Sequence, residues 1–283
     1  MNGSVKPLMG KIALVTGASR GVGKGIAISL SLAGAIVYIT GRTTDENSSA
    51  SGLAGNIHKT VEEIKHLGGN CIAILCDHRH DQEVKKVFET IAIKHKHLDI
   101  LVNNVWGGYE HFTDGTEFWN EKEFWTQPLS RWDSMFASGV RAHYVSSALA
   151  VPFMLLGKQG LIVNLSFFAA KRTDKGVAYS TAKAATDQMV ACMADEMREY
   201  NIAAVSVYPG LVRTESVLKA AEHLDLSNSE SPQFIGRAIV ALASDSQIMK
   251  KSGLTLIAAK LAQEYGFTDI DGKQPRPLSA EEI

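Results

Sequence analysis

Seven short apolar runs, separated by helical stretches, constrain the fold more than any other feature of this sequence. Most of the runs are continuously apolar and do not alternate with polar residues. Strands that helices cover on both faces have this composition. Strands that alternate with helices are typical of a parallel sheet wound in both directions. We therefore predict an α/β fold with about seven parallel strands and helices on both faces of the sheet.

The pattern also gives the expected bounds of each element. The expected strands are Lys11–Thr16, Ala35–Thr40, Cys71–Cys76, Asp99–Asn103, Leu161–Ser166, Ala203–Tyr208 and Leu254–Ala259. The clearest helical stretches are Gly23–Ala33, Ile57–Leu67, Asp81–Lys94 and Ala178–Tyr200. The sequence shows no internal repeat, so we treat residues 1–283 as one domain with substrate loops at 106–132 and 214–232 and a C-terminal tail at 261–283. The 106–132 loop is rich in aromatic residues, which either pack on their own domain or, as we favour, line an apolar substrate pocket.

Glycines gather directly after the first expected strand, in "VTGASRGVGKG". Gly17, Gly21 and Gly23 have the spacing G-x-x-x-G-x-G. Glycines allow a tight turn and let backbone N–H groups at a helix N-terminus approach a pyrophosphate. Any strand–helix turn can contain glycines, but this position favours a dinucleotide site and a doubly wound sheet of the Rossmann type. Gly25 is better explained by close helix packing.

Two arginines indicate which dinucleotide is preferred. A carboxylate at the end of the second strand would bind the ribose 2′-hydroxyl of NAD, but that position holds Gly41, followed by Arg42. Arg20 lies inside the glycine-rich loop. Guanidinium groups match a phosphate with bidentate geometry, so unless both arginines are only solvated surface charges, they favour NADP(H) over NAD(H). Asp77 is expected to accept a hydrogen bond from the adenine amino group.

A tyrosine and a lysine stand one helical turn apart in "AYSTAKAA", which places Tyr179 and Lys183 on the same helix face. The pair could decorate a surface or transfer protons. A free phenol has a pKa near ~10, which is too high for an efficient proton relay at neutral pH, and a nearby ammonium favours the phenolate. A rigid helix would hold the two groups together and so preorganise this electrostatic coupling.

Four motifs in this order resemble the short-chain dehydrogenase/reductase superfamily: "TGASRGVG", the Asn103–Asn104 pair, Ser166 with "YSTAK", and "YPGLVRT". The resemblance covers roughly residues 9 to 260 and implies a Tyr–Lys–Ser active site. Tyr179 would be the general acid or base, Lys183 would hold the nicotinamide ribose and lower the tyrosine pKa, and Ser166 would polarise the substrate oxygen. The cofactor-binding residues that we expect are Gly17, Ser19, Arg20, Gly21, Val22, Gly23, Arg42, Asp77, Asn104, Tyr179, Lys183, Pro209, Gly210, Val212 and Thr214.

Three departures from the family pattern stand out. Gly139 occupies a slot where relatives place an asparagine that supports a water-linked proton path to the lysine. Ser138, a backbone carbonyl beside Gly139, or His143 could take over that role; otherwise turnover would be slow. Trp106 stands where relatives have a small residue, and we expect it to narrow the cleft. The last strand lacks the usual V-D-G-G ending.

We expect the protein to catalyse NADP(H)-dependent interconversion of a small apolar carbonyl compound and its alcohol. The alternatives are a catalytically weak NADP-binding or sensor protein of the same fold and, less favoured, other chemistry at the same site such as C=C reduction. The resemblance implies a homodimer or homotetramer, assembled through the helices that carry Arg131–Leu149 and Tyr179–Tyr200.

Composition excludes other classes of partner and location. The net charge of −1 gives no electrostatic reason to expect nucleic acid. The apolar runs are all far shorter than the ~20 residues that span a bilayer, so we expect no stable membrane insertion. Three cysteines without C-x-x-C spacing and an N-terminus without an apolar signal core predict a cytoplasmic protein. The pairs His78/His80 and His95/His97 are expected to be surface histidines, with no metal site.

Overall fold

The computed structural model describes residues 6–45, 53–108, 123–279 and 282. Its centre is a seven-stranded, all-parallel sheet in the order β3-β2-β1-β4-β5-β6-β7. The strands are β1 Ile12–Val15, β2 Ile36–Gly41, β3 Asn70–Leu75, β4 Ile100–Asn103, β5 Gly160–Leu165, β6 Ile202–Tyr208 and β7 Thr255–Ile257. All seven expected strands are present, and the predicted fold class is confirmed.

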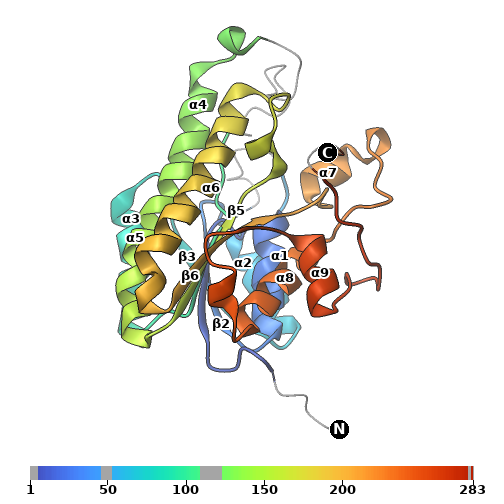
Figure 1. The fold of residues 1–283 in the computed structure, drawn as a ribbon. Coiled ribbons are helices and arrows are strands. Elements are labelled where there is room, and N and C mark those ends of the chain that lie inside the picture. The colour runs from blue at the N-terminus through green and yellow to red at the C-terminus, as the bar shows by residue number, and fades with distance from the viewer. Residues whose placement is uncertain (1–5, 46–52, 109–122, 280–281, 283) are drawn as a thin grey trace.

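Helices cover both faces of the sheet (Figure 1). The α-helices are α1 Gly21–Leu32, α2 Ile57–His66, α3 Asp81–Lys94, α4 Leu129–Met135, α5 Ala142–Gly157, α6 Val177–Met197, α7 Glu215–Lys219, α8 Pro232–Ser244 and α9 Ala258–Tyr265. One face packs against α1, α2, α8 and α9, and the other packs against α3, α5 and α6. Successive β1 residues serve the two cores in turn, because Ala13 and Val15 lie in the first and Ile12 and Leu14 in the second.

The strand order reverses between β1 and β4, because the chain builds the sheet outward from β1 in one direction and then in the other. In open α/β sheets the crevice at such a reversal, beyond the carboxyl ends of the strands, is where ligands bind. The loops that follow β1, β4, β5 and β6 therefore meet at one end of the sheet.

Close packing of α1 against α8 explains Gly25. A Cβ atom on Gly25 would lie 2.3 Å from the carbonyl carbon of Pro232, so no side chain fits there. Pro232 is the first residue of α8, and Ser231 caps this helix by accepting a hydrogen bond from the Phe234 N–H at 3.1 Å. The sequence-based explanation of Gly25 by helix packing is confirmed.

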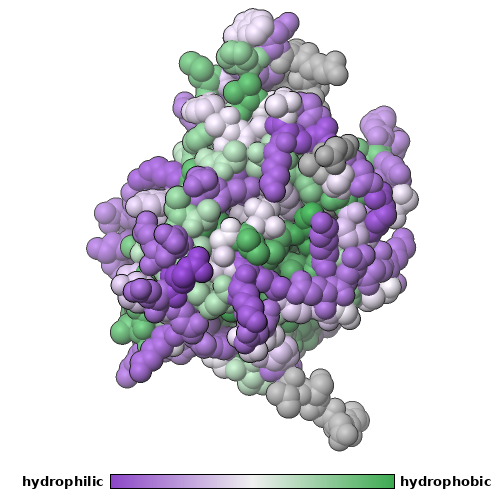
Figure 2. All heavy atoms as spheres, in the orientation of Figure 1, coloured by the Kyte–Doolittle hydropathy of each residue, from purple (hydrophilic) through white to green (hydrophobic). Residues whose placement is uncertain are grey.

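The predicted aromatic loop and the last strand both differ from expectation. Most of the 106–132 segment lies outside the described residues, but its last part is helical: a 3-10 turn η2 covers Phe124–Thr126, and α4 begins at Leu129. The side chains of Phe124, Trp125 and Leu129 are exposed. Figure 2 shows hydrophobic, green atoms among paler ones near the top of the molecule. The last strand is also shorter than predicted, because Ala258 and Ala259 begin α9.

Helices α4 and α5 are joined by a π-helical segment, η3 Phe136–Arg141. The three segments follow one another without a break in helical structure. The π segment contains Gly139, and segments of this kind occur frequently at functional sites. Among the described residues, no helix combines the length and apolar character needed to cross a membrane.

Candidate active site

The glycine-rich loop after β1 is held by contacts that leave no room for side chains at Gly17 and Gly23. Gly17 and Gly21 have φ angles of +69° and +55°, which favour glycine. A Cβ on Gly23 would lie 2.4 Å from the Asn104 side-chain nitrogen. That nitrogen donates hydrogen bonds of 2.9 Å to the carbonyls of both Thr16 and Gly17. Asn104, at the end of β4, therefore fastens the turn from within the sheet.

A cavity of about 500 Å³ opens at the carboxyl ends of the central strands. It is lined by most of the residues that the sequence singles out, namely Gly17, Ser19, Arg20, Gly21, Val22, Gly23, Arg42, Asp77, Asn104, Ser166, Tyr179, Lys183, Pro209 and Thr214. Gly210 and Val212 are not part of this lining. Residues that sequence reasoning did not assign also contribute, notably Thr43, His78, Phe167 and Glu215.

A carboxylate from the opposite side of the cavity sits on the glycine-rich loop. Oε2 of Glu215 accepts a hydrogen bond of 2.9 Å from the N–H of Gly21, the first residue of α1. The N-terminus of a helix attracts anions because its N–H groups are unpaired and the helix dipole is positive there. The Glu215 carboxylate thus occupies the position of an anionic ligand. The pyrophosphate of a dinucleotide would fit at the same N–H groups.

Two guanidinium groups also line the cavity, one of them from the glycine-rich loop itself. Arg20 donates from Nε to the Ala54 carbonyl at 3.0 Å and from Nη2 to the Gly55 carbonyl at 2.6 Å. Arg42 is partly exposed, and its Nη1 lies 3.9 Å from Oδ2 of Asp77. The pKa of Arg20 is lowered first by burial and also by the charge of Arg42, although Glu215 raises it. Two positive groups that line the same cavity suit a doubly charged anion.

Gly41 leaves no room for the carboxylate that an NAD site would place there. A Cβ on Gly41 would lie 2.8 Å from Cγ2 of Ile57 and 3.4 Å from Cβ of Ser19. Any longer side chain would have to displace the buried Ile57 side chain at the start of α2. The packing of α2 therefore fixes glycine at this position.

Asp77 follows β3 and is ionised. Burial alone would raise the pKa of Asp77, but hydrogen bonds from Arg79 together with the charges of Arg79 and Arg42 lower it to about 2. Arg79 binds the carboxylate through Nε at 3.0 Å and Nη2 at 2.6 Å. Asp77 lines the cavity as an acceptor whose position a neighbouring arginine holds.

The prediction that His78 is a surface histidine is wrong. Its side chain is buried between Thr40 Oγ1, 2.8 Å from Nε2, and Ser146 Oγ, 3.3 Å from Nδ1. Burial lowers the pKa of His78 to about 4, so the ring is neutral and joins β2 to α5. A pair with the spacing H-x-H gives no sign of burial, because the turn after β3 decides which ring faces inward.

Tyr179 and Lys183 lie on one face of α6 and both point into the cavity, as their spacing predicts. Tyr179 is 9% exposed and Lys183 7%. Nζ of Lys183 is 5.7 Å from the centroid of the Tyr179 ring and donates to the Leu165 carbonyl at 3.2 Å. Ser166, which follows β5, donates from Oγ to the main-chain carbonyl of Lys183 at 3.3 Å. Three groups suited to proton transfer and oxygen binding therefore converge.

Burial weakens the cation on which the sequence-based argument relied. It lowers the pKa of Lys183 to about 7, although the charge of Asp187, one turn further along α6, raises it. Near neutral pH the amine is a mixture of charged and neutral forms. Groups that touch the Lys183 side chain therefore control how much positive charge faces Tyr179.

His143 does not replace the missing asparagine by contacting Lys183. Its Nε2 lies 3.0 Å from the Val105 carbonyl and carries the hydrogen, because a carbonyl only accepts. Burial and the charge of Lys183 lower the pKa of His143 to about 3, so it stays neutral. Ser138 lines the cavity at the π segment, while the space beside Gly139 is filled by Trp106.

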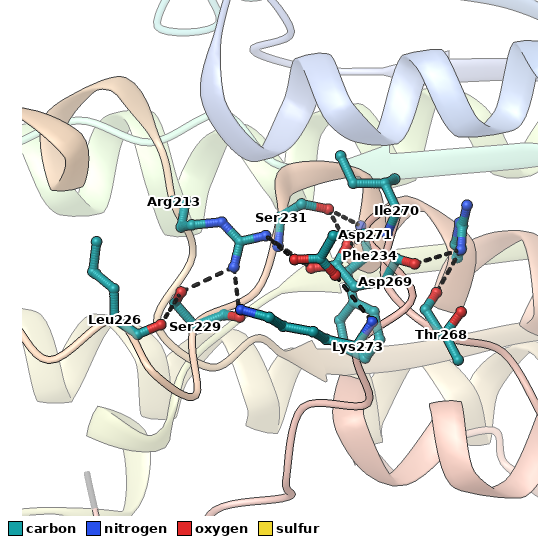
Figure 3. A network of polar contacts seen from close by, with 11 residues as sticks. Arg213, Leu226, Ser229, Ser231, Phe234, Thr268, Asp269, Ile270, Asp271 and Lys273 are labelled. Atoms are coloured by element: carbon teal, nitrogen blue, oxygen red, sulfur yellow. Dashed lines mark hydrogen bonds and ion pairs between the residues drawn. The ribbon is translucent and has the colours of Figure 1, made fainter.

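The C-terminal tail fastens the loop that carries Pro209 to Thr214 (Figure 3). Arg213 donates from Nη1 to the Ser229 carbonyl at 2.7 Å and from Nη2 to Oδ2 of Asp269 at 3.1 Å. Asp269 also accepts from the N–H of Ser231 at 2.8 Å and from its hydroxyl. One buried tail carboxylate therefore ties both ends of the 214–232 segment to the rest of the fold.

A second buried carboxylate, Glu230, accepts a hydrogen bond of 2.8 Å from the Gly210 N–H. Burial and the charge of Asp269 raise the pKa of Glu230 to about 7, although the Gly210 N–H and Arg213 lower it. The folded protein therefore holds this proton to a higher pH than the unfolded chain does. The resulting stabilisation is complete below about pH 4.5 and is lost as the pH rises through about 7.

We expect Glu230→Gln to remove this pH dependence. Glutamine keeps an oxygen for the Gly210 N–H but cannot ionise. The free energy of unfolding of the variant should exceed that of the wild type by about 1–3 kcal/mol more at pH 8 than at pH 5. Urea denaturation at the two pH values measures the difference, with the exposed Glu222→Gln as control. Equal pH slopes in Glu230→Gln and wild type would contradict this assignment.

The sequence of the chain matches a known family over the region that builds this cavity. Residues 11–225 match the family model described as short chain dehydrogenase. The chain belongs to the short-chain dehydrogenase family. The matched region runs from β1 through α7 and so includes the glycine-rich loop, Ser166, Tyr179, Lys183 and Glu215.

Individual relatives agree with this assignment. Dehydrogenase/reductase SDR family member 1 of Mus musculus is 38% identical over 283 aligned residues, which cover 95% of this chain and 86% of that protein. A metagenomic short-chain oxidoreductase solved with NADP has a TM-score of 0.68 and 26% identity over 88% of this chain and 96% of that one. A 7α-hydroxysteroid dehydrogenase solved with NADH and 7-oxo glycochenodeoxycholic acid has a TM-score of 0.72 and 27% identity over 97% and 99%. Solved structures that are similar to this short-chain dehydrogenase therefore include one with NADP and one with NADH.

Proposed function

We propose that this protein is an NADP(H)-dependent oxidoreductase that interconverts a carbonyl and an alcohol, with Tyr179 as the general acid or base. The observation that carries the proposal is the convergence of Tyr179, Lys183 and Ser166 in a cavity that also contains the glycine-rich loop. Family membership and the similar NADP-bound structure support an oxidoreductase. The residue roles rest on the geometry of this chain.

The chemistry divides between the cofactor and the protein. A bound nicotinamide supplies or accepts the hydride. In the direction of reduction, negative charge develops on the substrate oxygen, and the Tyr179 hydroxyl donates a proton to it. The Ser166 hydroxyl turns from the Lys183 carbonyl to donate to the same oxygen. Charged Lys183 stabilises the phenolate that remains on Tyr179.

Preference for the phosphorylated cofactor follows from charge and space at the adenosine end. Arg20 and Arg42 place two guanidinium groups on the cavity, and a 2′-phosphate would accept from them with charge-assisted hydrogen bonds. Gly41 has no room for the carboxylate that would select the free 2′-hydroxyl. Asn104 and the loop at Gly17 would lie along the diphosphate and its riboses.

The substrate class follows from the walls near Tyr179. The Tyr179 ring lies 5.6 Å from the Trp106 ring and 6.3 Å from the Phe167 ring, centroid to centroid. Both aromatic side chains line the cavity, so a substrate carbonyl would sit among apolar surfaces. We propose a ketone with an apolar, ring-containing body, which agrees with the steroid ligand of the similar 7α-hydroxysteroid dehydrogenase structure.

A carbonyl screen with NADPH and NADH in parallel tests the proposal. The panel should contain aromatic ketones, aldehydes, a 7-oxo bile acid and, as polar controls, short keto acids. We expect turnover of apolar ketones, faster with NADPH than with NADH. Binding of NADPH without turnover of any compound would contradict the enzymatic proposal and favour a cofactor-binding protein without catalysis.

Glu215→Gln should tighten NADPH binding. In the wild type, the carboxylate on the Gly21 N–H must leave before a pyrophosphate can take its place. An uncharged amide competes less well at a helix N-terminus, where a charge is worth about 0.3–1 kcal/mol. We expect the NADPH Kd to fall about 2- to 5-fold by fluorescence titration. Glu222→Gln is the matched control, because Glu222 is exposed and pairs with His223 away from the loop. Weaker binding by Glu215→Gln would overturn this assignment.

A further inference from the structure

The indole ring of Trp106 occupies the space that a side chain at position 139 would need. We call this space, where a Cβ on Gly139 would lie, the Gly139 notch. That Cβ would be 2.5 Å from Cζ3 and 2.8 Å from Cε3 of the indole. The ring and any side chain at position 139 therefore exclude one another. The π-helical segment Phe136–Arg141 presents the notch toward the cavity that Trp106 and Ser138 line.

The face of the same ring covers the amine of Lys183. Nζ lies 3.7 Å from the centroid of the Trp106 ring, well within the range of a cation–π contact. The edge-on contact between Trp106 and Tyr179, with an interplanar angle of 88°, places the indole against both members of the proton-transfer pair. A contact of this kind is stronger when the cation is desolvated, and Lys183 is buried.

The other groups around Lys183 give it little compensation for burial. Asp187 on α6 raises its pKa, but this carboxylate also accepts a hydrogen bond from the Tyr208 hydroxyl on β6. His143 on α5 is neutral. The Tyr179 ring centroid lies 5.7 Å from Nζ, and the Leu165 carbonyl accepts from Nζ at 3.2 Å. The π face of Trp106 is therefore a principal source of negative potential at Nζ.

We propose that Trp106, admitted by the Gly139 notch, is the positioning residue that keeps the Lys183 amine charged and aimed at Tyr179. The inference rests on the proposed function of Lys183 but concerns a different residue and a different physical interaction. The face of the Trp106 ring contacts the Lys183 amine, and the same ring sterically excludes a side-chain amide at position 139. Trp106 and Gly139 act as one unit. Loss of the indole ring, or a side chain at position 139 that displaces the ring, would each remove its contact with the Lys183 amine.

Fluorinated tryptophans at position 106 test this proposal without changing the packing. Site-specific incorporation of tryptophan carrying zero, one or two ring fluorines lowers the negative potential of the face at nearly constant volume. The Lys183 pKa is read in cofactor-free protein from the ¹³Cε NMR signal of labelled lysine, assigned by its loss in Lys183→Met. We expect the pKa to fall stepwise, by about 1 unit over the series, since ~1.4 kcal/mol corresponds to one unit. A constant Lys183 pKa would overturn the proposal.

The Gly139→Ala background separates a cation–π contact from a general effect of fluorine. The added methyl group would displace the ring from the notch. In this background the fluorine series should no longer move the Lys183 pKa. The same series at Trp132, which stacks on Phe136 at 4.2 Å and does not line the cavity, should also have no effect. An equal slope in Gly139→Ala, or a slope at Trp132, would contradict the proposed geometry.

Activity gives a separate readout. If the protein reduces carbonyls, activity requires the charged form of Lys183 and is lost as the pH rises through its pKa. The alkaline limb of the kcat/KM profile should therefore shift to lower pH with fluorination, in parallel with the Lys183 pKa. A shifting pKa without any turnover would preserve this inference and contradict the proposed function. Turnover with a constant pKa would preserve the proposed function and overturn this inference.

Discussion

Replacing Tyr179 with phenylalanine should reduce kcat/KM for carbonyl reduction by about 10²- to 10⁴-fold, the usual contribution of a positioned general acid. The substitution removes the hydroxyl and keeps the ring. The ring contacts with Trp106 and Phe167 at 5.6 and 6.3 Å should therefore persist, and the fold with them. The NADPH Kd should change by less than about 3-fold, because the substitution removes one hydroxyl and leaves the glycine-rich loop, Arg20 and Arg42 in place.

Tyr144→Phe is the matched control for this experiment. Tyr144 lies on α5, its side chain is exposed, and it does not line the cavity. Its loss of a hydroxyl should leave kcat/KM unchanged. If Tyr179→Phe kept more than a tenth of the wild-type kcat/KM, another group would have to supply the proton.

Replacing Arg42 with alanine should shift the cofactor preference away from NADPH. A charge-assisted hydrogen bond contributes about 1.5–3 kcal/mol, so the NADPH Kd should rise about 10- to 100-fold. The NADH Kd should change far less, because NADH has no 2′-phosphate. Arg20→Ala should act in the same direction, but it also removes the hydrogen bonds that hold the Ala54 and Gly55 carbonyls.

Two controls separate loss of phosphate binding from loss of charge. Arg42→Lys keeps the charge without the bidentate fork and should give an intermediate Kd for NADPH. Arg141→Ala removes an arginine that pairs with Asp81 and does not line the cavity, so both Kd values should stay as in the wild type. Equal losses of NADPH and NADH affinity in Arg42→Ala would contradict selection through the 2′-phosphate.

The fold could be predicted well because its signals are local and repeated. Each strand is an apolar run next to a helical stretch, and the cores on both faces keep such runs apolar. Predictions failed where tertiary contacts decide. The last strand ends early because Ala258 and Ala259 begin α9, and no periodicity marks the π-helical turn at Phe136–Arg141. His78 is buried only because Thr40 and Ser146 come to meet it.

Some residues of the candidate site could likewise be predicted from the sequence, and others could not. Spacing alone places Tyr179 and Lys183 on one helix face, and the glycine-rich loop has a recognisable pattern. Trp106 and Gly139 are separated by more than thirty positions, and each is noticeable in the sequence only as a departure from the family pattern. Their complementarity appears only when the π segment is folded against the end of β4. Glu215 gives no signal at all, since an acidic residue at the start of a helix is common.

Transfer of deuterium tests the central claim most directly. NADPH that carries deuterium at both C4 positions of the nicotinamide is incubated with the wild-type protein and an apolar ketone from the panel, and the products are read by mass spectrometry. We predict an alcohol with deuterium on the former carbonyl carbon, formed by the wild type and not by Tyr179→Phe over the same time. An alcohol without deuterium, no alcohol from any ketone of the panel, or equal formation by Tyr179→Phe would contradict hydride transfer coupled to this tyrosine.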